Sequence, residues 1–303
     1  MLLKARCEAN ELMILRYLNT RMELTEKEHQ YYLNLERGYE GEIIFDKLIE
    51  SLHDQRYIII NDLLLEVNNS YFQIDALIIS QGAIHLLDIK NFQGDFYLEL
   101  DKFYAVKNGH EYKNPVDQLK RSAILFRQLL QNFKHNYLVE SSVIFINPEF
   151  TLYQAPMGQP IILPTQVKRY LRDLDKTPSR LNDGHMKLAQ RLISMHQTEN
   201  PFTRLPKYNY DLVRKGVYCR QCKSFITSRV NYQFNCNTCG ISEKIESTIL
   251  RNVEEFKLLF PNRKITTENI YDWCQVDLHK RTVSRILKKH YTTFGNTSDT
   301  YFE

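Results

Sequence analysis

Apolar and polar residues follow two different periods along the first half of the chain. Apolar residues recur at helical spacing within residues 1–35, and those in residues 43–52 form one stripe, which predicts an amphipathic helix. Short apolar runs come next, separated by Gly82 and Gly94 as turn residues, and such runs are typical of strands. The predicted strands are residues 57–61, 63–67, 72–80, 83–90 and 96–100.

A helix and a strand complete this region. Asn114 is a favourable N-cap and Pro115 suits the first helical position, so a helix is expected to run to about residue 133. Residues 142–147 form a further apolar strand, closed by Pro148. The order of helix, several strands, helix and strand predicts an α/β or α+β fold, with a central mixed sheet flanked by helices.

The rest of the chain changes character after three prolines in residues 155–164. Two shorter helices are predicted near residues 165–174 and 183–196, and a proline-containing linker follows them. These composition shifts divide the chain into segments. They are an N-terminal helical segment (1–35), the main α/β domain with a helical extension (36–200), a linker (201–216), a cysteine ribbon (217–246), a small basic helical unit (250–291) and a tail (292–303).

Charge is distributed unevenly along the 303 residues. The net charge is +4, yet residues 204–291 hold 17 Lys and Arg residues against 8 Asp and Glu residues. A basic C-terminal third on a near-neutral body indicates a module that binds a polyanion such as nucleic acid. No apolar stretch is long enough to cross a membrane, and the N-terminus lacks the apolar core of a secretory signal. We therefore expect a cytoplasmic protein with no membrane partner.

The residues best suited to catalysis lie in a predicted β-hairpin that turns at Gln81-Gly82. If the hairpin is symmetric about this pair, Asp75 lies opposite Asp88, with Cβ atoms about 4.5–5.5 Å apart. Two carboxylates this close between apolar strands require compensation, which a divalent cation such as Mg²⁺ or Mn²⁺ provides. Lys90 lies two residues beyond Asp88 on the same face, and an ammonium beside a metal suits hydrolysis of a phosphodiester.

A simpler interpretation is an ordinary surface ion pair between Asp88 and Lys90, with Asp75 exposed at an edge. The apolar runs 76–79 and 84–87 argue against it, because they indicate strands buried on both faces. The metal site also depends on register, since a shift of one residue would place the two carboxylates on opposite faces.

Four short motifs follow one another in this region. They are Gly38-Tyr39-Glu40-Gly41-Glu42 at a helix start, Gln73-Ile74-Asp75, Asp88-Ile89-Lys90-Asn91 followed by Gly94, and Asn114-Pro115-x-x-Gln118. In this order they resemble the NERD (nuclease-related) domain, a family of the PD-(D/E)XK nuclease superfamily. The resemblance covers residues 36–150 and depends on the order of the elements, because each motif alone is common.

The resemblance implies a restriction-endonuclease-like fold and a set of site residues. Asp75 and Asp88 would be the metal ligands, and Glu42 the helix-borne acid that completes the metal site. Lys90 would be the catalytic lysine, and Gln118 the polar residue on the next helix. Asp88 departs from the family, in which Glu is more common, although the superfamily accepts either residue. Taken alone, Glu42 and Gln118 are better explained as first-turn helix residues that have no catalytic role.

Four of the six cysteines form two C-x-x-C pairs separated by thirteen residues. Such pairs in a reducing compartment favour metal over disulfides, and two of them complete a closed tetrahedral site for structural Zn²⁺. An iron–sulfur or redox centre is the alternative, but nothing else in the sequence points to electron transfer. The predicted ligands are Cys219, Cys222, Cys236 and Cys239.

The C-terminal segment resembles a helix-turn-helix. Residues 267–274 predict a capped helix, residues 276–279 a turn, and residues 280–291 a second helix with an apolar inner face. The turn lacks the glycine often found there, and a solvated basic face on a packing helix is the alternative interpretation. The candidate nucleic-acid-binding residues are Lys280, Arg281, Arg285, Lys288 and Lys289.

Three functions are compatible with these features. The first is a metal-dependent DNA endonuclease or nickase that the C-terminal module delivers to its substrate, with a homodimer as one expected assembly. The second is a non-catalytic nucleic-acid-binding protein that retains the nuclease fold, and the third is an adaptor that binds a protein partner. Lys90 separates the first two, because a binding protein needs no ammonium beside the metal. Salt dependence separates the second from the third, because phosphate contacts weaken steeply with added salt.

Overall fold

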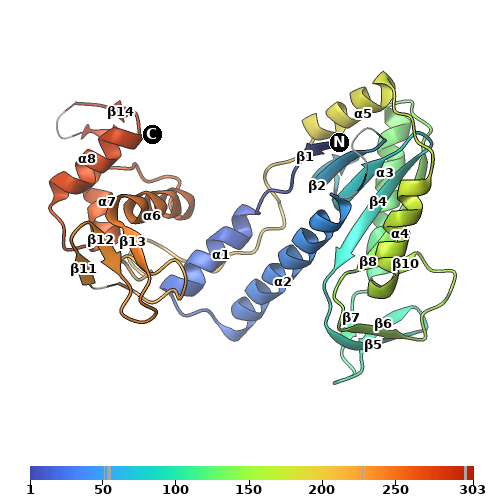
Figure 1. Ribbon diagram of the computed structural model, residues 1–303, viewed down its shortest axis with the longest axis horizontal. Helices are drawn as coiled ribbons and strands as arrows, with labels where there is room; N and C mark the ends of the chain where they lie inside the picture. The colour runs from blue at the N-terminus through green and yellow to red at the C-terminus, as the bar shows by residue number, and fades with distance from the viewer. Residues whose placement is uncertain (51, 53–55, 227, 297–298) are drawn as a thin grey trace. The chain divides into compact units, whose positions relative to one another are not determined.

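The computed structural model describes all residues except 51, 53–55, 227 and 297–298 (Figure 1). Residue 51 of the predicted helix 43–52, residue 227 of the ribbon and residues 297–298 of the tail therefore lie outside the described residues. The chain divides into two compact units. The first unit comprises Met1–Glu8 and Leu33–Thr203, and the second comprises Ala9–Tyr32 and Arg204–Glu303.

A six-stranded sheet forms the centre of the first unit. Its strands, in spatial order, are β1 (Leu2–Lys4), β2 (Ile58–Val67), β3 (Ser70–Ile79), β4 (Ala83–Lys90), β8 (Leu138–Phe145) and β10 (Ile161–Ile162). Strands β2, β3 and β4 are antiparallel to one another, whereas β8 pairs with β4 in parallel. The outer strands β1 and β10 are also parallel to their neighbours. This mixed sheet, with helices on both faces, confirms the predicted fold class.

The helices of the first unit cover both faces of the sheet, which explains why its strands are apolar almost throughout. They are α2 (Glu26–Ile49) and α4 (Pro164–Lys176) on one face, and α3 (Pro115–Asn132) and α5 (Asp183–Ser194) on the other. Phe45 of α2 and Phe126 of α3 are fully buried in the two separate clusters that result. The Asn114 side chain caps α3 as predicted, because it accepts the N–H of Val116 at 3.0 Å.

Helix α2 begins at Glu26, well before the predicted start near residue 43. Thr25 and Glu28 explain the difference, since the Glu28 carboxylate accepts the N–H of Thr25 and the Thr25 hydroxyl accepts the N–H of Glu28. This reciprocal pair is a capping box, and the sequence Thr-x-x-Glu is its signal. Downstream, the helix passes without a break through Gly38 and Gly41.

A small four-stranded sheet follows β4 and β8 along the chain. Its strands, in spatial order, are β7 (Glu111–Tyr112), β6 (Lys102–Ala105), β5 (Gly94–Glu99) and β9 (Phe150–Tyr153). The predicted strand 96–100 therefore belongs here and not to the central sheet. One face of this sheet packs on the central core, where Phe96 and Phe103 stack at 4.9 Å and Phe145 and Phe150 stack at 4.0 Å between ring centroids.

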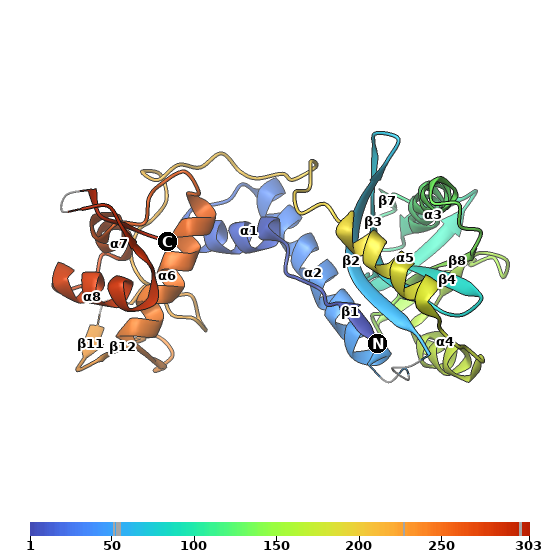
Figure 2. The same cartoon turned by 90° about the horizontal axis from the view of Figure 1, so that it is seen from above.

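The second unit combines a ribbon with a helical core (Figure 2). Its elements are α1 (Asn10–Arg21), β11 (Ser228–Val230), β12 (Gln233–Asn235), β13 (Ser242–Lys244), α6 (Ile245–Leu259), α7 (Thr267–Cys274), α8 (Lys280–His290), β14 (Thr293–Phe294) and β15 (Tyr301–Phe302). The three antiparallel ribbon strands lead directly into α6. Trp273 is fully buried at the centre, where it packs with Phe256, Phe260 and Tyr210.

Helix α1 belongs to this second unit through Leu18, which is fully buried in its core, and through one buried arginine. The guanidinium of Arg21 has no exposed surface and pairs with Glu255, from Nε to Oε1 at 2.5 Å and from Nη2 to Oε2 at 3.1 Å. It also donates to the Asn252 side chain and lies 4.0 Å from the Trp273 ring centroid. The segment 1–35 is thus shared between the units, since residues 1–8 and 33–35 belong to the first unit and residues 9–32 to the second. The boundary falls within α2, whose first residues, 26–32, count with the second unit.

The last residues of the chain differ from the frayed tail that the sequence suggested. Strands β14 and β15 pair with each other, and the backbone of Thr292 exchanges two hydrogen bonds with that of Glu303. Phe302 is 1% exposed because it packs into the helical core. In the part of the chain that the structure describes, no helix has the length and apolar character to span a membrane.

Candidate active site and metal centre

The predicted register of the carboxylate hairpin is confirmed for its four paired positions, which do not include Asp75 and Asp88 themselves. Strands β3 and β4 pair from Ile79 opposite Ile84 to Ala76 opposite Leu87, as symmetry about Gln81-Gly82 requires. The ladder stops there, and one carboxylate oxygen of Asp75 accepts the N–H of Ile89 at 2.7 Å. We call the place where β3 and β4 part, at Asp75 and Asp88, the fork.

The pairing of β3 with β2, its neighbour on the other side, is also interrupted at Asp75. In β2, Asn61 pairs with Ala76 and Leu63 pairs with Ile74, so Asp62 and Asp75 are left out of the ladder. Asp62 has a φ of 54°, a conformation that few non-glycine residues adopt. Side-chain alternation shifts at this point, because Ile60 and Leu63 enter the same buried cluster although they are three residues apart.

Side chains from the N-terminal strand satisfy the backbone at this interruption. The Lys4 ammonium donates to the carbonyl oxygens of Asn61 and Asp62, at 3.0 and 2.6 Å. The Arg6 guanidinium donates to the carbonyl oxygen of Asp75 at 2.8 Å. The sequence alone did not place Lys4 or Arg6 in the site. Their spacing of two residues, which puts side chains on one face of a strand, was the only available signal.

Asp88 and Lys90 form a buried pair on β4. Lys90 Nζ lies 2.9 Å from Asp88 Oδ1, and their side chains are 19% and 11% exposed, which contradicts the simple surface ion pair. The second oxygen of Asp88, Oδ2, is buried and has no hydrogen-bond partner among the described residues. Burial raises the pKa of Asp88 to about 7, with Lys90 opposing the rise and Asp75 adding to it. Burial lowers the pKa of Lys90, but Asp88 and Asp75 outweigh it, so the pKa is raised.

Glu42 approaches the fork from α2 because that helix comes very close to the end of β4. A Cβ atom at Gly41 would lie 2.5 Å from the Cβ of Asn91, so only glycine fits there. The Asn91 amide in turn donates to the carbonyl oxygen of Arg37 at 2.7 Å. Burial and then Asp75 raise the pKa of Glu42 to about 8, although Arg6 opposes the rise.

The predicted site residues are brought together only in part. Lys90 and Asp88 touch, and the charges of Asp75 and Glu42 act on Lys90 as well. Gln118 is exposed in the first turn of α3, and no side-chain hydrogen bond joins it to another described residue. Glu42, Asp75 and Asp88 do not come within 4.8 Å of one another as a group of three ligands.

The residues at the fork nevertheless fit a divalent cation. Mg²⁺ and Mn²⁺ prefer carboxylate oxygens, and Mg²⁺ usually keeps several waters, so its ligands need not touch one another. The Oδ2 atom of Asp88, which has no partner among the described residues, would supply one such oxygen in a buried position, where a missing partner is costly. Asp75 and Glu42 would supply carboxylates from two other elements.

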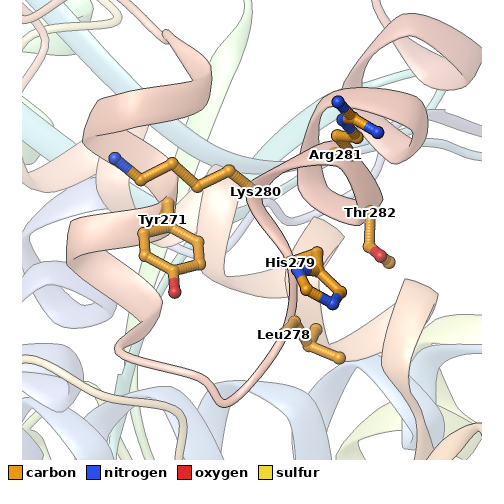
Figure 3. A pocket seen from close by; sticks show the side chains of 6 residues that line it. All are labelled: Tyr271, Leu278, His279, Lys280, Arg281 and Thr282. Atoms are coloured by element: carbon orange, nitrogen blue, oxygen red, sulfur yellow. The ribbon is translucent and has the colours of Figure 1, made fainter.

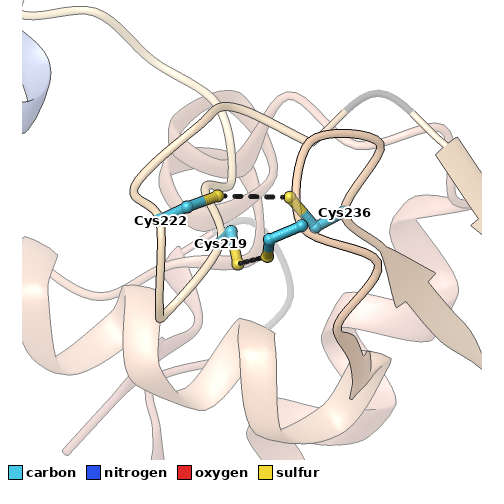
Figure 4. Close-up of side chains that lie close together, drawn as sticks. Cys219, Cys222 and Cys236 are labelled. Carbon is cyan, nitrogen blue, oxygen red and sulfur yellow. Dashed lines mark hydrogen bonds between the residues drawn. The ribbon is translucent and has the colours of Figure 1, made fainter.

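The four predicted cysteines form the one group of at least three metal-ligating residues in the described part of the chain, with ligand atoms within 4.8 Å (Figure 4). The Sγ atoms of Cys219 and Cys239 are 3.6 Å apart, and those of Cys222 and Cys236 are 3.4 Å apart. A tetrahedral zinc site with Zn–S bonds of about 2.3 Å places sulfur atoms about 3.8 Å apart, so these distances fit the metal.

Two matching turns hold the cysteines. In the first turn, Cys219 N–H donates to the carbonyl of Ser224 and Lys223 N–H donates to the carbonyl of Cys219. In the second turn, Cys236 bonds to Ile241 and Gly240 in the same pattern. Hydrogen bonds from Ser224 lower the pKa of Cys222 to about 6, which favours the thiolate that a metal binds.

Helices α7 and α8 have the connection expected of a helix-turn-helix. Gln275 ends α7 in the left-handed conformation, with φ 42° and ψ 51°. It therefore occupies the turn position at which a glycine is often found and is absent from this sequence. Beside the turn is an open hollow lined by Tyr271, Leu278, His279, Lys280, Arg281 and Thr282 (Figure 3). Lys280 extends over the Tyr271 ring, with 5.3 Å between Nζ and the ring centroid.

The five basic residues of α8 fall into two groups. Lys280 pairs with Glu268 at 2.6 Å, and Lys289 pairs with Glu246 at 2.7 Å. The other three, at positions i, i+4 and i+7 of one exposed stripe, form no ion pair with a described residue. They are Arg281, Arg285 and Lys288.

With this geometry described, the chain can be compared with known proteins. Residues 37–146, a little over a third of the chain, match the family model described as NERD, nuclease-related domain. The matched residues lie within the first unit, and they include the motifs around Glu42, Asp75 and Asp88.

One solved structure and the curated proteins complete the comparison. The small subunit of the heterodimeric restriction endonuclease R.BspD6I is 12% identical to this chain, covering 61% of this chain and 87% of that subunit. Its TM-score of 0.25 is too low to support an argument about fold or function. No curated protein matches the chain.

Proposed function

We propose that the protein is a metal-dependent DNA endonuclease or nickase whose catalytic centre is the fork. The observation that carries the proposal is the buried, unpartnered Oδ2 of Asp88, held beside the Lys90 ammonium. When bound there, Mg²⁺ or Mn²⁺ would polarise the scissile phosphate and make bound water more acidic. The nuclease-related domain that contains these residues supports the assignment.

The residues of the fork have separate roles in this proposal. Asp75, Asp88 and Glu42 hold the cation, and Asp75 is itself fixed by the N–H of Ile89. Lys90 remains protonated, because its pKa is raised, and therefore stabilises negative charge that develops on the phosphate or orients the attacking water. The pair of Asp88 and Lys90 thus supplies a ligand and a cation from one strand.

Cleavage of supercoiled plasmid and of single-stranded DNA, with Mg²⁺ or Mn²⁺, tests the proposal. We expect wild type to cleave, and Asp88→Ala and Lys90→Ala each to lose at least about 100-fold in rate. Lys102→Ala is the matched control, because Lys102 forms an exposed pair with Glu111 on the small sheet of the same unit. Equal cleavage by Lys90→Ala and wild type would reject Lys90 as a catalytic residue.

We propose further that α8 contacts the phosphates of the nucleic acid through Arg281, Arg285 and Lys288. These three cations face solvent without a described acidic partner, whereas Lys280 and Lys289 are held by Glu268 and Glu246. We expect Ala at the three stripe positions to lower the slope of binding against salt by about 2–3, since each phosphate contact contributes about 0.9. Ala at Lys280 and Lys289 should lower it less, and equal losses would contradict the division.

A non-catalytic nucleic-acid-binding protein is the second candidate. It is favoured by the separation of the three carboxylates and by the ion pair that Arg6 makes with Glu42. In that case no plasmid is cleaved with either metal, while salt-sensitive DNA binding persists unchanged in Asp88→Ala and Lys90→Ala.

A further inference from the structure

We propose that Arg6 is a positioning residue that makes Glu42, and not Asp46, the helix carboxylate of the metal site. The proposal rests on the proposed nuclease function. Glu42 and Asp46 are four residues apart on α2, so both project from the same helix face. Both carboxylates lie near Arg6, and their spacing on the helix does not show which of them is the metal ligand.

The contacts of Arg6 do distinguish them. Its Nε and Nη2 atoms donate to the two oxygens of Asp46, both at 3.0 Å, so neither oxygen is left without a partner. Its Nη1 atom donates to only one oxygen of Glu42, Oε2, at 2.7 Å. The other oxygen of Glu42 accepts no hydrogen bond from a described residue. Arg6 therefore saturates one carboxylate and orients the other with an oxygen to spare.

Arg6 also connects this helix face to the fork. The same Nη2 atom that binds Asp46 donates to the main-chain oxygen of Asp75, 2.8 Å away. The Arg6 side chain is 2% exposed, so these contacts are made in a dry environment where a planar, bidentate guanidinium is hard to replace. A lysine could keep the charge, but it could not donate hydrogen bonds to all three residues with the same geometry.

The N-terminal strand fixes the position of Arg6. Leu2 and Lys4 pair with β2 in parallel, and the amino group of Met1 donates to the carbonyl of Tyr57 at 2.6 Å. Arg6 follows directly after this strand, well outside residues 37–146 that match the nuclease-related domain. The structure thus assigns a role in the site to a segment that the domain alone does not include.

The binding of Mn²⁺, measured by calorimetry without DNA, tests the proposal. We expect Arg6→Gln to weaken Mn²⁺ binding about 10- to 100-fold, as removal of an outer partner of a metal ligand does, and Arg6→Lys to fall between it and wild type. Glu42→Gln should lose at least about ten times more affinity than Asp46→Asn, although both remove one charge from the same helix face. Arg56→Gln is the control, because it breaks the Arg56–Asp175 pair of the same unit.

The outcomes separate this proposal from the proposed function. If wild type binds Mn²⁺ and cleaves DNA but Arg6→Gln and Arg6→Lys bind the metal as wild type does, the role of Arg6 is overturned and the nuclease stands. Equal losses in Asp46→Asn and Glu42→Gln would also overturn it, because Arg6 would then not discriminate. If wild type neither binds Mn²⁺ nor cleaves, both proposals fail together. Melting temperatures of the variants, compared with Arg56→Gln, show whether a loss of affinity is only a loss of folding.

Discussion

The fork and the cysteine ribbon are two candidate metal centres assembled in opposite ways. The ribbon takes its ligands from two short turns with the same hydrogen-bond pattern, so each half is complete within six residues. The fork brings together carboxylates from α2, β3 and β4, and Arg6, which follows the N-terminal strand, donates a hydrogen bond to one of them, Glu42. A centre of the first kind depends on its metal for folding, whereas the second depends on a fold that forms without metal.

The largest effect is expected from loss of the ribbon metal. We expect Cys236→Ala, or a strong chelator, to release zinc and unfold residues 217–246, because binding of structural zinc contributes about 10–16 kcal/mol in small zinc domains. Zinc content and limited proteolysis measure this result. Cys7→Ala is the control, since Cys7 is exposed and outside the group. Full retention of zinc by Cys236→Ala would contradict the assignment. Removal of Mg²⁺ should leave the first unit folded.

A smaller effect is expected from the buried arginine of the second unit. Arg21→Ala leaves Glu255 charged, fully buried and without its partner, which should cost about 3–5 kcal/mol. Chemical denaturation of the zinc-bound protein gives the value. Lys280→Ala breaks an exposed pair with Glu268 and should cost less than about 1 kcal/mol. If both variants lose the same stability, breaking the buried pair costs no more than breaking the exposed one, which contradicts the prediction.

The close approach of α2 to the fork can be tested with two glycines of one helix. Gly41→Ala forces a Cβ against that of Asn91, and we expect a loss of about 1–3 kcal/mol together with weaker cleavage. Gly38→Ala meets no atom of the described residues within 4 Å and should stabilise the helix by up to about 1 kcal/mol. Thermal melts and plasmid cleavage by both variants provide the comparison. A Gly41→Ala protein as active as wild type would show that the helix can move away without harm.

The smallest effect separates the two turns of the ribbon. Lys223 and Gly240 hold equivalent positions, with φ values of 61° and 74°. Because glycine adopts this conformation without strain, Lys223→Gly should stabilise the ribbon by about 0.5–1 kcal/mol and Gly240→Ala should weaken it by a similar amount. The rate at which a chelator removes zinc reports both changes. Equal rates for the two variants would mean that the left-handed conformation at these positions does not limit the stability of the ribbon.

Local signals explain what could be predicted from the sequence. The spacing of Cys219, Cys222, Cys236 and Cys239 predicts their gathering because each turn is self-contained. The turn at Gln81-Gly82 likewise determines the register of β3 and β4. Where the interaction was local but unrecognised, as in the capping box of Thr25 and Glu28, the boundary of the helix was wrong.

Contacts between distant segments could not be predicted in this way. Arg6 and Arg21 are ordinary surface residues by composition, and their burial depends on partners 36 to 234 positions away. The resemblance named Gln118, but its side chain is exposed and forms no hydrogen bond with a described residue. The pairing of β14 with β15 depends on Phe302 finding a place in a core formed by other elements.

The interruption at Asp62 and Asp75 has a consequence for how the chain can change in evolution. In β2 and in β3 the alternation of side chains shifts at the same level, so the two shifts compensate. The half of the β2–β3 hairpin beyond Asp62 and Asp75 therefore keeps its apolar side chains in the core. Deletion of Asp62 alone would shift the pairing of Leu63–Val67 with β3 by one residue, because β3 would still contain the extra residue Asp75. Only a matching deletion in β3 would restore the match, and that deletion removes the carboxylate of Asp75. Insertions and deletions in this hairpin are therefore constrained in pairs, and the constraint protects the fork.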